Sequence, residues 1–431
     1  MIPIALFAAA MAVLGPIADS GHWSGEARLG PQTWQVELSA RADSVWLSVP
    51  SLWSPRQPAA HLSWNGRVAR FDFPLGLGTI EVDLDPTVPE LTGTFHSATG
   101  AVGSLRLVRG NPPSFAVREI AVVRAGIVIA GSATAPAAPG PKPAVIILHG
   151  GGPSSRADSP PYRFWGEYFA TKGYVAITYD KRGNGGSTGD WRTVGFGERA
   201  DDVLALVRWL RRQPEIDPNR IGLFAVSQGT WVAGLAAARD PRIKFVVQVS
   251  GPVVSPLEAD TYAALNGLRT AGLGAHELAE FERLWRQEVD AIRHPAESPV
   301  WSRYRAADLA ARGSTWYAKS RYAPSVPESW FTNWYRLVAD FDPMSTLRQV
   351  RAPMLWLYGD HDTQSDVPGN LRRIAVLRRT KGTRLEVARF PGTGHGFLAP
   401  VDSFGVALGP LATPPGFFET LDGWLARQML P

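Results

Sequence analysis

The stretch of residues 217–238 constrains the fold of this chain more than any other, because it joins a buried strand to a buried helix through a serine. Residues 220–224 are mostly apolar and follow an Asp-Pro-Asn turn, which indicates a short buried strand. The residues after Gly229 are small and apolar, as in a buried helix. Ser227 lies between them, with Ala225 and Gly229 two positions away on either side. Small residues there permit a sharp turn that holds the serine hydroxyl at the positive end of a helix.

Composition places this chain among globular proteins of more than one domain. It has 431 residues, of which 45% are hydrophobic and 19% charged. The formal charge of +5 is spread along the chain without runs of like charge, so no nucleic-acid partner is indicated. The chain has no cysteine, which excludes disulfides, thiolate metal sites and a cysteine nucleophile.

The N-terminal residues 1–20 predict a cleaved signal peptide. Residues 2–18 are uncharged and apolar, about the length of a signal core and short for a membrane span, and Ala18 could precede a cleavage site. The alternative is a buried N-terminal segment, since no Lys or Arg precedes the apolar stretch. We therefore expect an exported protein, periplasmic or extracellular, without stable membrane insertion after cleavage; otherwise it is cytoplasmic.

Residues 21–110 predict a separate all-β domain. Apolar and polar residues alternate there, and Gly, Pro, Asn and Asp separate the runs. One buried face per strand suits a small antiparallel barrel or sandwich. We expect Trp23, Trp46, Trp53 and Trp64 to belong to its core; the alternative is a carbohydrate-binding face.

Residues 115–431 predict an α/β domain with a doubly wound, mostly parallel sheet. A hairpin opens it, and buried strands then alternate with helical stretches. The expected strands after the hairpin are 144–148, 174–179, 220–224, 245–249, 353–358 and 384–390. The expected helices include 200–212 and a final one over 416–428.

Residues from about 256 to 340 interrupt this alternation with a helical segment rich in aromatic residues. Ligands of such sheets bind at the carboxyl ends of the strands, so a segment inserted there is expected to be a lid over the site. Trp301, Trp316, Trp330 and Trp334 are its candidate wall residues. The alternative is an extra helical layer that has no contact with the site.

Ser227 would need a base and an orienting carboxylate to act as a nucleophile, because an alcohol is weakly nucleophilic at neutral pH. His395 and Asp362 each lie in a loop directly after a predicted strand, and they follow Ser227 in the chain order Ser, Asp, His. Asp360 and Asp366 compete with Asp362 for the acid role. We prefer Asp362 because it lies three residues after Gly359, clear of the strand end.

A serine nucleophile also requires donors for the oxyanion that forms on the attacked carbonyl. The backbone N–H of Gln228 is the first candidate, because it directly follows the nucleophile. Gly151, in the glycine-rich loop after strand 144–148, is the second. We expect His149 to be structural, with its ring bonded to nearby backbone.

These motifs together resemble bacterial α/β-hydrolases of the serine aminopeptidase (S33) and prolyl-oligopeptidase-like (S9) group, which includes exported esterases with a β-rich N-terminal domain. The resemblance rests on His-Gly-Gly-Gly-Pro at 149–153, Tyr-Asp-Lys-Arg-Gly at 179–183, Ala-Val-Ser-Gln-Gly at 225–229, Gly-Asp-His-Asp at 359–362 and Gly-His-Gly at 394–396. It covers residues 115–431 well and 21–110 only loosely. It implies serine hydrolase chemistry with Ser227, Asp362 and His395, without a cofactor or metal. Because the group spans esterases, thioesterases and peptidases, the resemblance does not fix the substrate. Ala225 and Thr230 depart from the glycines that the group often has.

The sequence leaves three functions open. The first is a hydrolase of carboxylic esters acting on a small-molecule substrate through an acyl-enzyme. The second is an aminopeptidase or dipeptidyl peptidase acting on short peptides; it would need a carboxylate for the substrate amine, and the predicted lid contains several acidic residues. The third is a non-catalytic binding protein on a hydrolase scaffold, against which the complete Ser-Asp-His set argues.

Overall fold

The computed structural model describes residues 21–41, 44–85, 87–156, 160–320, 323–379, 384–397 and 413–429. The chain divides into two compact units. The first ends at Pro112, but it does not include Ser51–Pro55, which cluster with the second unit from Pro113 onward. The predicted signal peptide, residues 1–20, lies outside the described residues. Within those residues, no helix has both the length and the apolarity that a membrane crossing requires.

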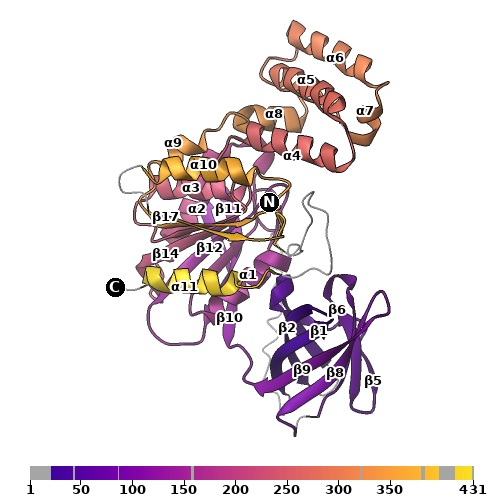
Figure 1. Ribbon diagram of the computed structural model, residues 1–431. Helices are drawn as coiled ribbons and strands as arrows, with labels where there is room; N and C mark the ends of the chain where they lie inside the picture. Colours follow the sequence, from indigo (N-terminus) through magenta and orange to yellow (C-terminus); the bar gives the residue numbers. More distant parts are fainter. Residues whose placement is uncertain are drawn as a thin grey trace, which may run out of the picture. The chain divides into compact units, whose positions relative to one another are not determined.

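The first unit is built on one antiparallel sheet (Figure 1). Its strands are β1 His22–Leu29, β2 Gln32–Arg41, β3 Ser44–Val49, β4 Ser54–Pro58, β5 Ser63–Asn65, β6 Val68–Phe73, β7 Gly78–Asp83, β8 Glu90–Ser97 and β9 Val102–Gly110. The short helical turns η1 Pro50–Leu52 and η2 Pro74–Gly76 interrupt the meander. The strand order is β4-β3-β2-β1-β9-β8-β7-β6-β5.

This sheet curls on itself, because its two edge strands are neighbours in the sequence. β4 ends at Pro58 and β5 begins at Ser63, and five peptide steps reach at most about 18 Å. A flat sheet of this strand order would place its edges about 38 Å apart. The predicted barrel is therefore nearer the structure than the predicted sandwich of two stacked sheets.

The core of the first unit consists of the alternating apolar residues that the sequence indicated. The ring of Trp34 lies 5.5 Å from that of Phe73 and 5.2 Å from that of Phe95. Trp23 is buried as expected, but Trp64 is 38% exposed, so the core prediction is wrong for this residue. Trp46 is half-buried beneath the Arg56 guanidinium, 4.8 Å from its ring.

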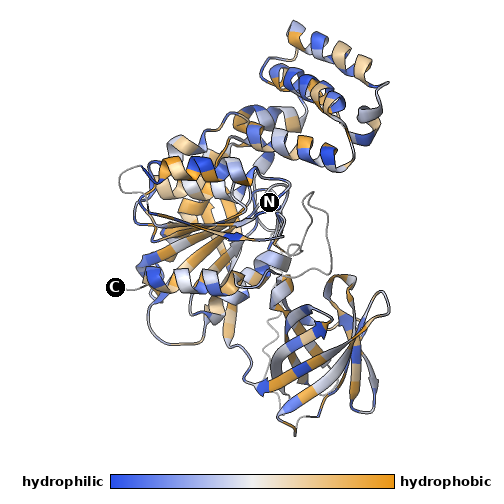
Figure 2. Ribbon diagram, in the orientation of Figure 1, coloured by the Kyte–Doolittle hydropathy of each residue, from blue (hydrophilic) through white to orange (hydrophobic). Residues whose placement is uncertain are grey.

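The second unit contains a mostly parallel sheet whose central strands β13, β15 and β16 are buried throughout, with hydrophobic residues dominating its interior (Figure 2). Its strands are β10 Phe115–Arg124, β11 Ile127–Pro136, β12 Lys142–Leu148, β13 Val175–Tyr179, β14 Ile216–Val226, β15 Val246–Val249, β16 Met354–Gly359 and β17 Leu385–Phe390. Their order is β10-β11-β13-β12-β14-β15-β16-β17. β10 and β11 form the antiparallel hairpin, and β12 through β17 pair in parallel. The predicted doubly wound α/β sheet is confirmed.

Helices cover both faces of this sheet, because successive residues of each strand point to opposite sides. Val145 and Ile147 pack in the cluster that contains α1 and α11, whereas Ile146 and Leu148 pack in the cluster that contains α2 and α3. The helices are α1 Pro160–Thr171, α2 Phe196–Leu210, α3 Gly229–Arg239, α9 Pro343–Leu347, α10 Val367–Leu377 and α11 Phe417–Met429, with the short turn η3 Trp191–Thr193.

The predicted Asp-Pro-Asn turn lies inside β14 rather than before it. Lys142 pairs with Ile216 and Ala144 pairs with Ile221, so residues 217–220 bulge out of the pairing with β12. The Asp217 carboxylate accepts a hydrogen bond from the Asn219 N–H at 2.9 Å, which is the local bond of an Asx turn. The strand therefore starts earlier than residue 220.

A helical segment is inserted between β15 and β16 (Figure 1). It consists of α4 Pro256–Thr270, α5 Ala275–Ile292, α6 Pro299–Ala311, α7 Thr315–Ser320 and α8 Trp330–Val338. Its predicted wall residues have other roles. Trp301 and Trp316 are buried inside the segment itself, where Trp316 packs on Phe281 at 5.7 Å. Trp330 is 51% exposed and contacts Trp191 at 5.7 Å, and the buried Trp334 contacts the same ring.

Trp53 belongs to the core of the second unit, although it lies between β3 and β4 in the sequence. Its indole is 5% exposed and lies 5.2 Å from Trp165 of α1 and 6.1 Å from Phe417 of α11. The Ser51 carbonyl accepts a 2.7 Å hydrogen bond from the Thr413 N–H. The prediction that Trp53 is buried is right, but the core is that of the α/β unit.

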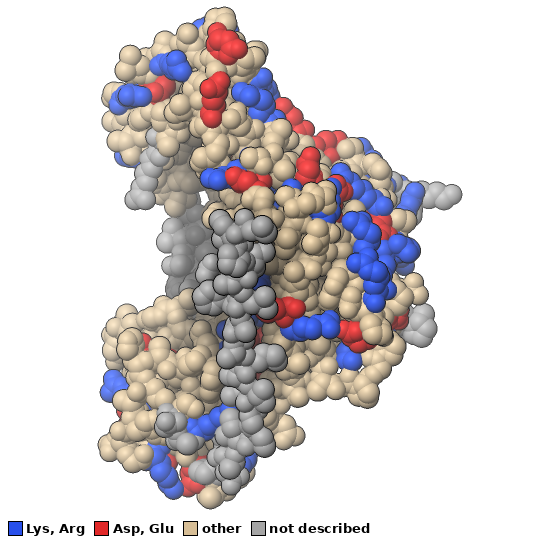
Figure 3. All heavy atoms as spheres, turned by 180° about the vertical axis from the view of Figure 1, so that it is seen from behind, with Lys and Arg blue, Asp and Glu red and all other residues tan. Residues whose placement is uncertain are grey.

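Acidic and basic side chains are mixed on the surface shown in Figure 3. Many of them pair, as Arg427 does with Glu386 at 2.8 Å and Arg106 with Glu90 at 2.7 Å. Pairs this exposed contribute little to stability. Their interspersion agrees with the absence of like-charge runs in the sequence.

Candidate active site

Ser227 lies at a sharp turn between β14 and α3. Its φ of 50° is in the left-handed region, which is strained for a residue with a side chain. A Cβ on Gly229 would lie 2.5 Å from the His149 carbonyl oxygen, so only glycine fits where the turn packs against the end of β12. The strain and the close approach explain why small residues flank the serine.

The two departures from the family pattern are accommodated away from the Ser227 hydroxyl. Ala225 is fully buried in the strand, where it pairs with Leu148. The Thr230 hydroxyl donates to the Ser227 carbonyl at 2.6 Å, and its side chain packs where a Cβ on Gly251 would be. Thr230 therefore lies behind the turn.

Three of the predicted residues meet in one chain of hydrogen bonds. The His395 Nε2 lies 3.0 Å from the Ser227 Oγ, and the His395 Nδ1 lies 2.8 Å from the Asp362 Oδ2. The carboxylate makes Nδ1 the protonated nitrogen, which leaves Nε2 to accept from the serine. This geometry permits proton transfer from the hydroxyl to the ring.

The Asp362 carboxylate is fixed on its other side by backbone. Its Oδ1 accepts from the N–H groups of Gln364 at 2.8 Å and Ser365 at 2.9 Å, and its side chain is fully buried. Asp360 instead accepts from the Gly392 N–H, and Asp366 caps α10 through the Gly369 N–H. Of the three candidate acids, only Asp362 contacts His395.

Ser250 supports the histidine loop, a role that the sequence did not reveal. It follows β15 with a φ of 50°, it is fully buried, and its Oγ donates to the His395 carbonyl at 2.8 Å. A Cβ on Gly359 would lie 2.1 Å from the Thr393 carbonyl. The acid loop, which follows β16 and contains Asp362, therefore contacts the backbone of the histidine loop, which follows β17 and contains His395. The sequence shows only a serine after a predicted strand. The strained φ angle that singles this serine out cannot be read from a sequence.

The two predicted oxyanion donors lie near Ser227. Gln228 directly follows it, and a Cβ on Gly150 would lie 3.6 Å from the Ser227 Cβ, which places the glycine loop beside the serine. The Gly150 N–H donates to the Tyr162 hydroxyl at 2.9 Å. Among the described residues, the N–H groups of Gln228 and Gly151 have no hydrogen-bond acceptor. Both are available to a substrate oxygen.

Buried cations lie against these two donors. The Lys181 Nζ donates to the carbonyls of Gly150 at 2.8 Å and Gly152 at 2.5 Å. The Arg199 Nη1 donates to the Gln228 side-chain oxygen at 2.8 Å. Neither cation was among the predicted site residues.

His149 has the structural role that the sequence predicted. Its Nε2 donates to the Tyr179 carbonyl at 2.5 Å. Burial and the positive charge of Lys181 hold its pKa well below the ordinary value, so the ring is neutral. It anchors the start of the glycine loop to β13.

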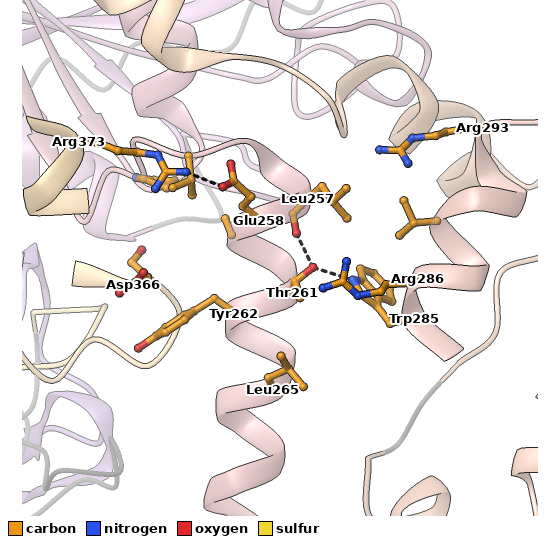
Figure 4. Close-up of a pocket in the computed structure, with 15 residues that line it drawn as sticks. Leu257, Glu258, Thr261, Tyr262, Leu265, Trp285, Arg286, Arg293, Asp366 and Arg373 are labelled. Atoms are coloured by element: carbon orange, nitrogen blue, oxygen red, sulfur yellow. Dashed lines mark hydrogen bonds and ion pairs between the residues drawn. The ribbon is translucent and has the colours of Figure 1, made fainter. Parts of the chain in front are cut away.

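A cavity of about 490 Å³ lies between the inserted segment and the acid loop (Figure 4). α4 contributes Leu257, Tyr262 and Leu265, and α5 contributes Trp285, whose indole N–H donates to Thr261 at 2.8 Å. Ser365, which bonds Asp362, forms part of the opposite wall. None of the four tryptophans predicted to form a wall lines this cavity; the aromatic residues that do are Tyr262 and Trp285.

The sequence model of the X-Pro dipeptidyl-peptidase (S15) family matches residues 106–389. This match covers more than half of the chain. The chain belongs to the X-Pro dipeptidyl-peptidase (S15) family. Like the resemblance drawn from the motifs, this match indicates a hydrolytic enzyme of the serine hydrolase class. The matched range contains Ser227 and Asp362 and ends before His395.

Individual relatives differ in the activities that their names state. A polyketide transferase, claH of Penicillium crustosum, is 36% identical over 96 residues, which are 22% of this chain and 31% of that protein. Dipeptidyl aminopeptidase BIII of Pseudoxanthomonas mexicana is 31% identical over 93 residues, 21% of this chain and 13% of that protein. The solved structure of the DcsB complex with its substrate analogue aligns with a TM-score of 0.46 and 20% identity, over 74% of this chain and 100% of that one. The chain thus spans under a third of these two curated relatives.

Proposed function

We propose that this protein hydrolyses carboxylic esters with Ser227 as nucleophile, His395 as general base and acid, and Asp362 as the orienting carboxylate. The observation that carries the proposal is the unbroken hydrogen-bond chain from Ser227 through His395 to Asp362, on a serine with a φ of 50°. Two unoccupied N–H groups beside this serine support it further.

The reaction follows from these contacts. The Ser227 Oγ forms a bond to the ester carbonyl carbon as its proton moves to the His395 Nε2, and the carbonyl π electrons move to the oxygen. The Gln228 and Gly151 N–H groups donate to this oxyanion. Collapse restores the carbonyl and expels the alkoxide, which takes the proton from His395. Water then attacks the acyl-enzyme by the same steps and releases the acid.

We place the acyl group of the substrate in the cavity beneath α4 and α5. Its lining includes apolar side chains from both helices, and its wall shares Ser365 with the support of Asp362. Ligand cavities of this size combine apolar walls with a few polar groups that orient the ligand, and the charged residues here are Glu258, Arg286, Arg293, Asp366 and Arg373. The inserted segment would then act as a lid that selects the acyl chain.

A dipeptidyl peptidase or aminopeptidase is the second candidate, and the family match favours it. Such an enzyme needs a carboxylate to bind the substrate amine. The cavity contains Glu258 and Asp366, but Glu258 pairs with Arg373 at 2.6 Å and Asp366 caps α10. Because both carboxylates already have partners in the protein, we favour the ester.

Three measurements test the proposal. Ser227→Ala should fold normally and lose nearly all hydrolysis of p-nitrophenyl esters and all labelling by a fluorophosphonate. Retention of more than a tenth of the activity would rule out Ser227 as nucleophile. Faster turnover of aminoacyl-p-nitroanilides than of the esters would favour the peptidase, and a wild-type protein that does not label would favour a non-catalytic binding protein.

A further inference from the structure

Lys181 and Arg199 are buried cations without an acidic partner. They are 3% and 6% exposed, and neither forms an ion pair with any Asp or Glu that the structure describes. The nearby buried acids have other partners, since Asp180 pairs with Arg156 and Asp202 with Arg182. Removing a charge from water without pairing it is costly, so such groups are candidates for functional roles.

The contacts of Lys181 set the direction of the Gly151 N–H. A trans peptide unit holds its C=O and N–H in opposite directions. The Gly150 carbonyl and the Gly151 N–H belong to one such unit, and Lys181 binds that carbonyl at 2.8 Å. A second bond to the Gly152 carbonyl fixes the loop on the other side. Lys181 therefore keeps the Gly151 N–H pointing away from itself and polarises it.

Arg199 acts on the other donor. Its guanidinium donates to the Gln228 side chain and lies over the Phe196 ring at 5.5 Å. The Gln228 amide nitrogen lies 3.9 Å from where a Cβ on Gly151 would be, so this side chain packs against the loop that carries the other donor. One arginine thus holds the side chain of the residue that carries the first N–H, and this side chain packs beside the loop that carries the second.

Lys181 and Arg199 together make the surroundings of the two N–H donors electropositive. Burial and the charge of Arg199 hold the pKa of Lys181 well below its ordinary value, and burial lowers the pKa of Arg199 to about 10. Negative charge that develops near them relieves this unfavourable state. The Asp202 carboxylate raises the pKa of Arg199, but it forms its ion pair with Arg182; His149 is neutral and Tyr179 keeps its proton, since burial raises its pKa.

We propose that Lys181 and Arg199 are positioning residues for the oxyanion: they hold the Gly151 and Gln228 N–H groups in place, and they favour the negative charge that forms on the substrate oxygen. This inference rests on the proposed function. It predicts that their loss slows chemistry and leaves substrate binding nearly unchanged, because the oxyanion exists only in the transition state and the tetrahedral intermediate.

The test compares Lys181→Met with Lys172→Met, a partly exposed lysine that pairs with Asp422 away from the site. For the neutral ester p-nitrophenyl butyrate, Lys181→Met should lower kcat by about 10- to 100-fold, short of the roughly 10²–10³-fold cost of a whole oxyanion donor. KM should change less than threefold, and the Ki of phenylboronic acid should rise in parallel with the loss of kcat/KM. Lys172→Met should match wild type. Counting sites by the end point of fluorophosphonate labelling corrects for unfolded protein.

A second variant covers the case in which Lys181→Met yields no labelled sites. Gln228→Met removes the acceptor of Arg199 but keeps the backbone N–H, and it should lower kcat several-fold at constant KM. An unchanged kcat in the folded variants overturns the inference, as does a loss carried by KM. A loss confined to an anionic ester, mono-p-nitrophenyl succinate, would instead make the cations a site for a substrate carboxylate. Full activity of Ser227→Ala would reject the proposed function itself, which separates the two failures.

Discussion

Replacing Asp362 by Asn tests the proposed chemistry most sharply, because the change is nearly isosteric. The Asn oxygen can still accept from the N–H groups of Gln364 and Ser365, so the loop should keep its conformation. The new NH₂ group, however, faces the His395 Nδ1 across the 2.8 Å contact, and two donors cannot bond. The ring must then protonate Nε2, which lies 3.0 Å from Ser227 and can no longer accept its proton.

The expected loss follows from this tautomer. A triad with the wrong tautomer loses roughly 10⁴-fold in kcat, or about 5.4 kcal/mol of transition-state stabilisation. Hydrolysis of p-nitrophenyl butyrate and the rate of fluorophosphonate labelling should both fall, while the melting temperature changes little. Asp360→Asn and Asp366→Asn are the matched controls, and each should lose less than about tenfold because neither carboxylate touches the histidine. Equal losses in the three variants would refute the assignment of Asp362.

Three further changes test the fold and the cavity. Trp53→Ala should destabilise the α/β unit by about 3–5 kcal/mol, as seen in its melting transition, whereas Trp64→Ala should cost less than about 0.5 kcal/mol; similar shifts for both would contradict the placement of Trp53. Gly229→Ala should abolish fluorophosphonate labelling, because its Cβ would lie 2.5 Å from a backbone carbonyl, and a labelled variant would show that the turn can relax. Trp285→Ala should change the ratio of rates on short and long acyl esters, each methylene being worth roughly 1–3 kcal/mol, while Trp330→Ala, which lies outside the cavity, should not; an unchanged ratio for Trp285→Ala would remove the acyl group from this cavity.

The sequence predicted the α/β sheet and the meeting of Ser227, Asp362 and His395 for one physical reason. Buried parallel strands are continuous apolar runs, and the loops that follow them all reach the same edge of the sheet. A residue directly after such a run can therefore be placed without knowing any contact. This reasoning needs only the order of the strands in the sequence.

The rest depended on contacts between distant segments. Burial of Trp301 and Trp316 follows from their apolar rings, but a sequence does not state whether a ring packs within the inserted helices or against a ligand. Lys181 and Arg199 cannot be distinguished from surface cations in the sequence. Nothing local shows that the nearby acids, Asp180 and Asp202, form ion pairs with other residues. The curl of the first sheet likewise depends on which strands form its two edges, and the sequence does not show the strand order.

The position of Trp53 limits how this protein can be divided or can evolve. A fragment that starts after Pro112 would retain the whole α/β sheet and all proposed catalytic residues, yet it would leave an empty apolar socket against Trp165 and Phe417. Loss of the N-terminal region would thus destabilise the α/β unit by about the 3–5 kcal/mol expected for removing Trp53, even if that region had no other task. The core of the second unit therefore depends on five residues that the sequence places within the stretch of the first unit.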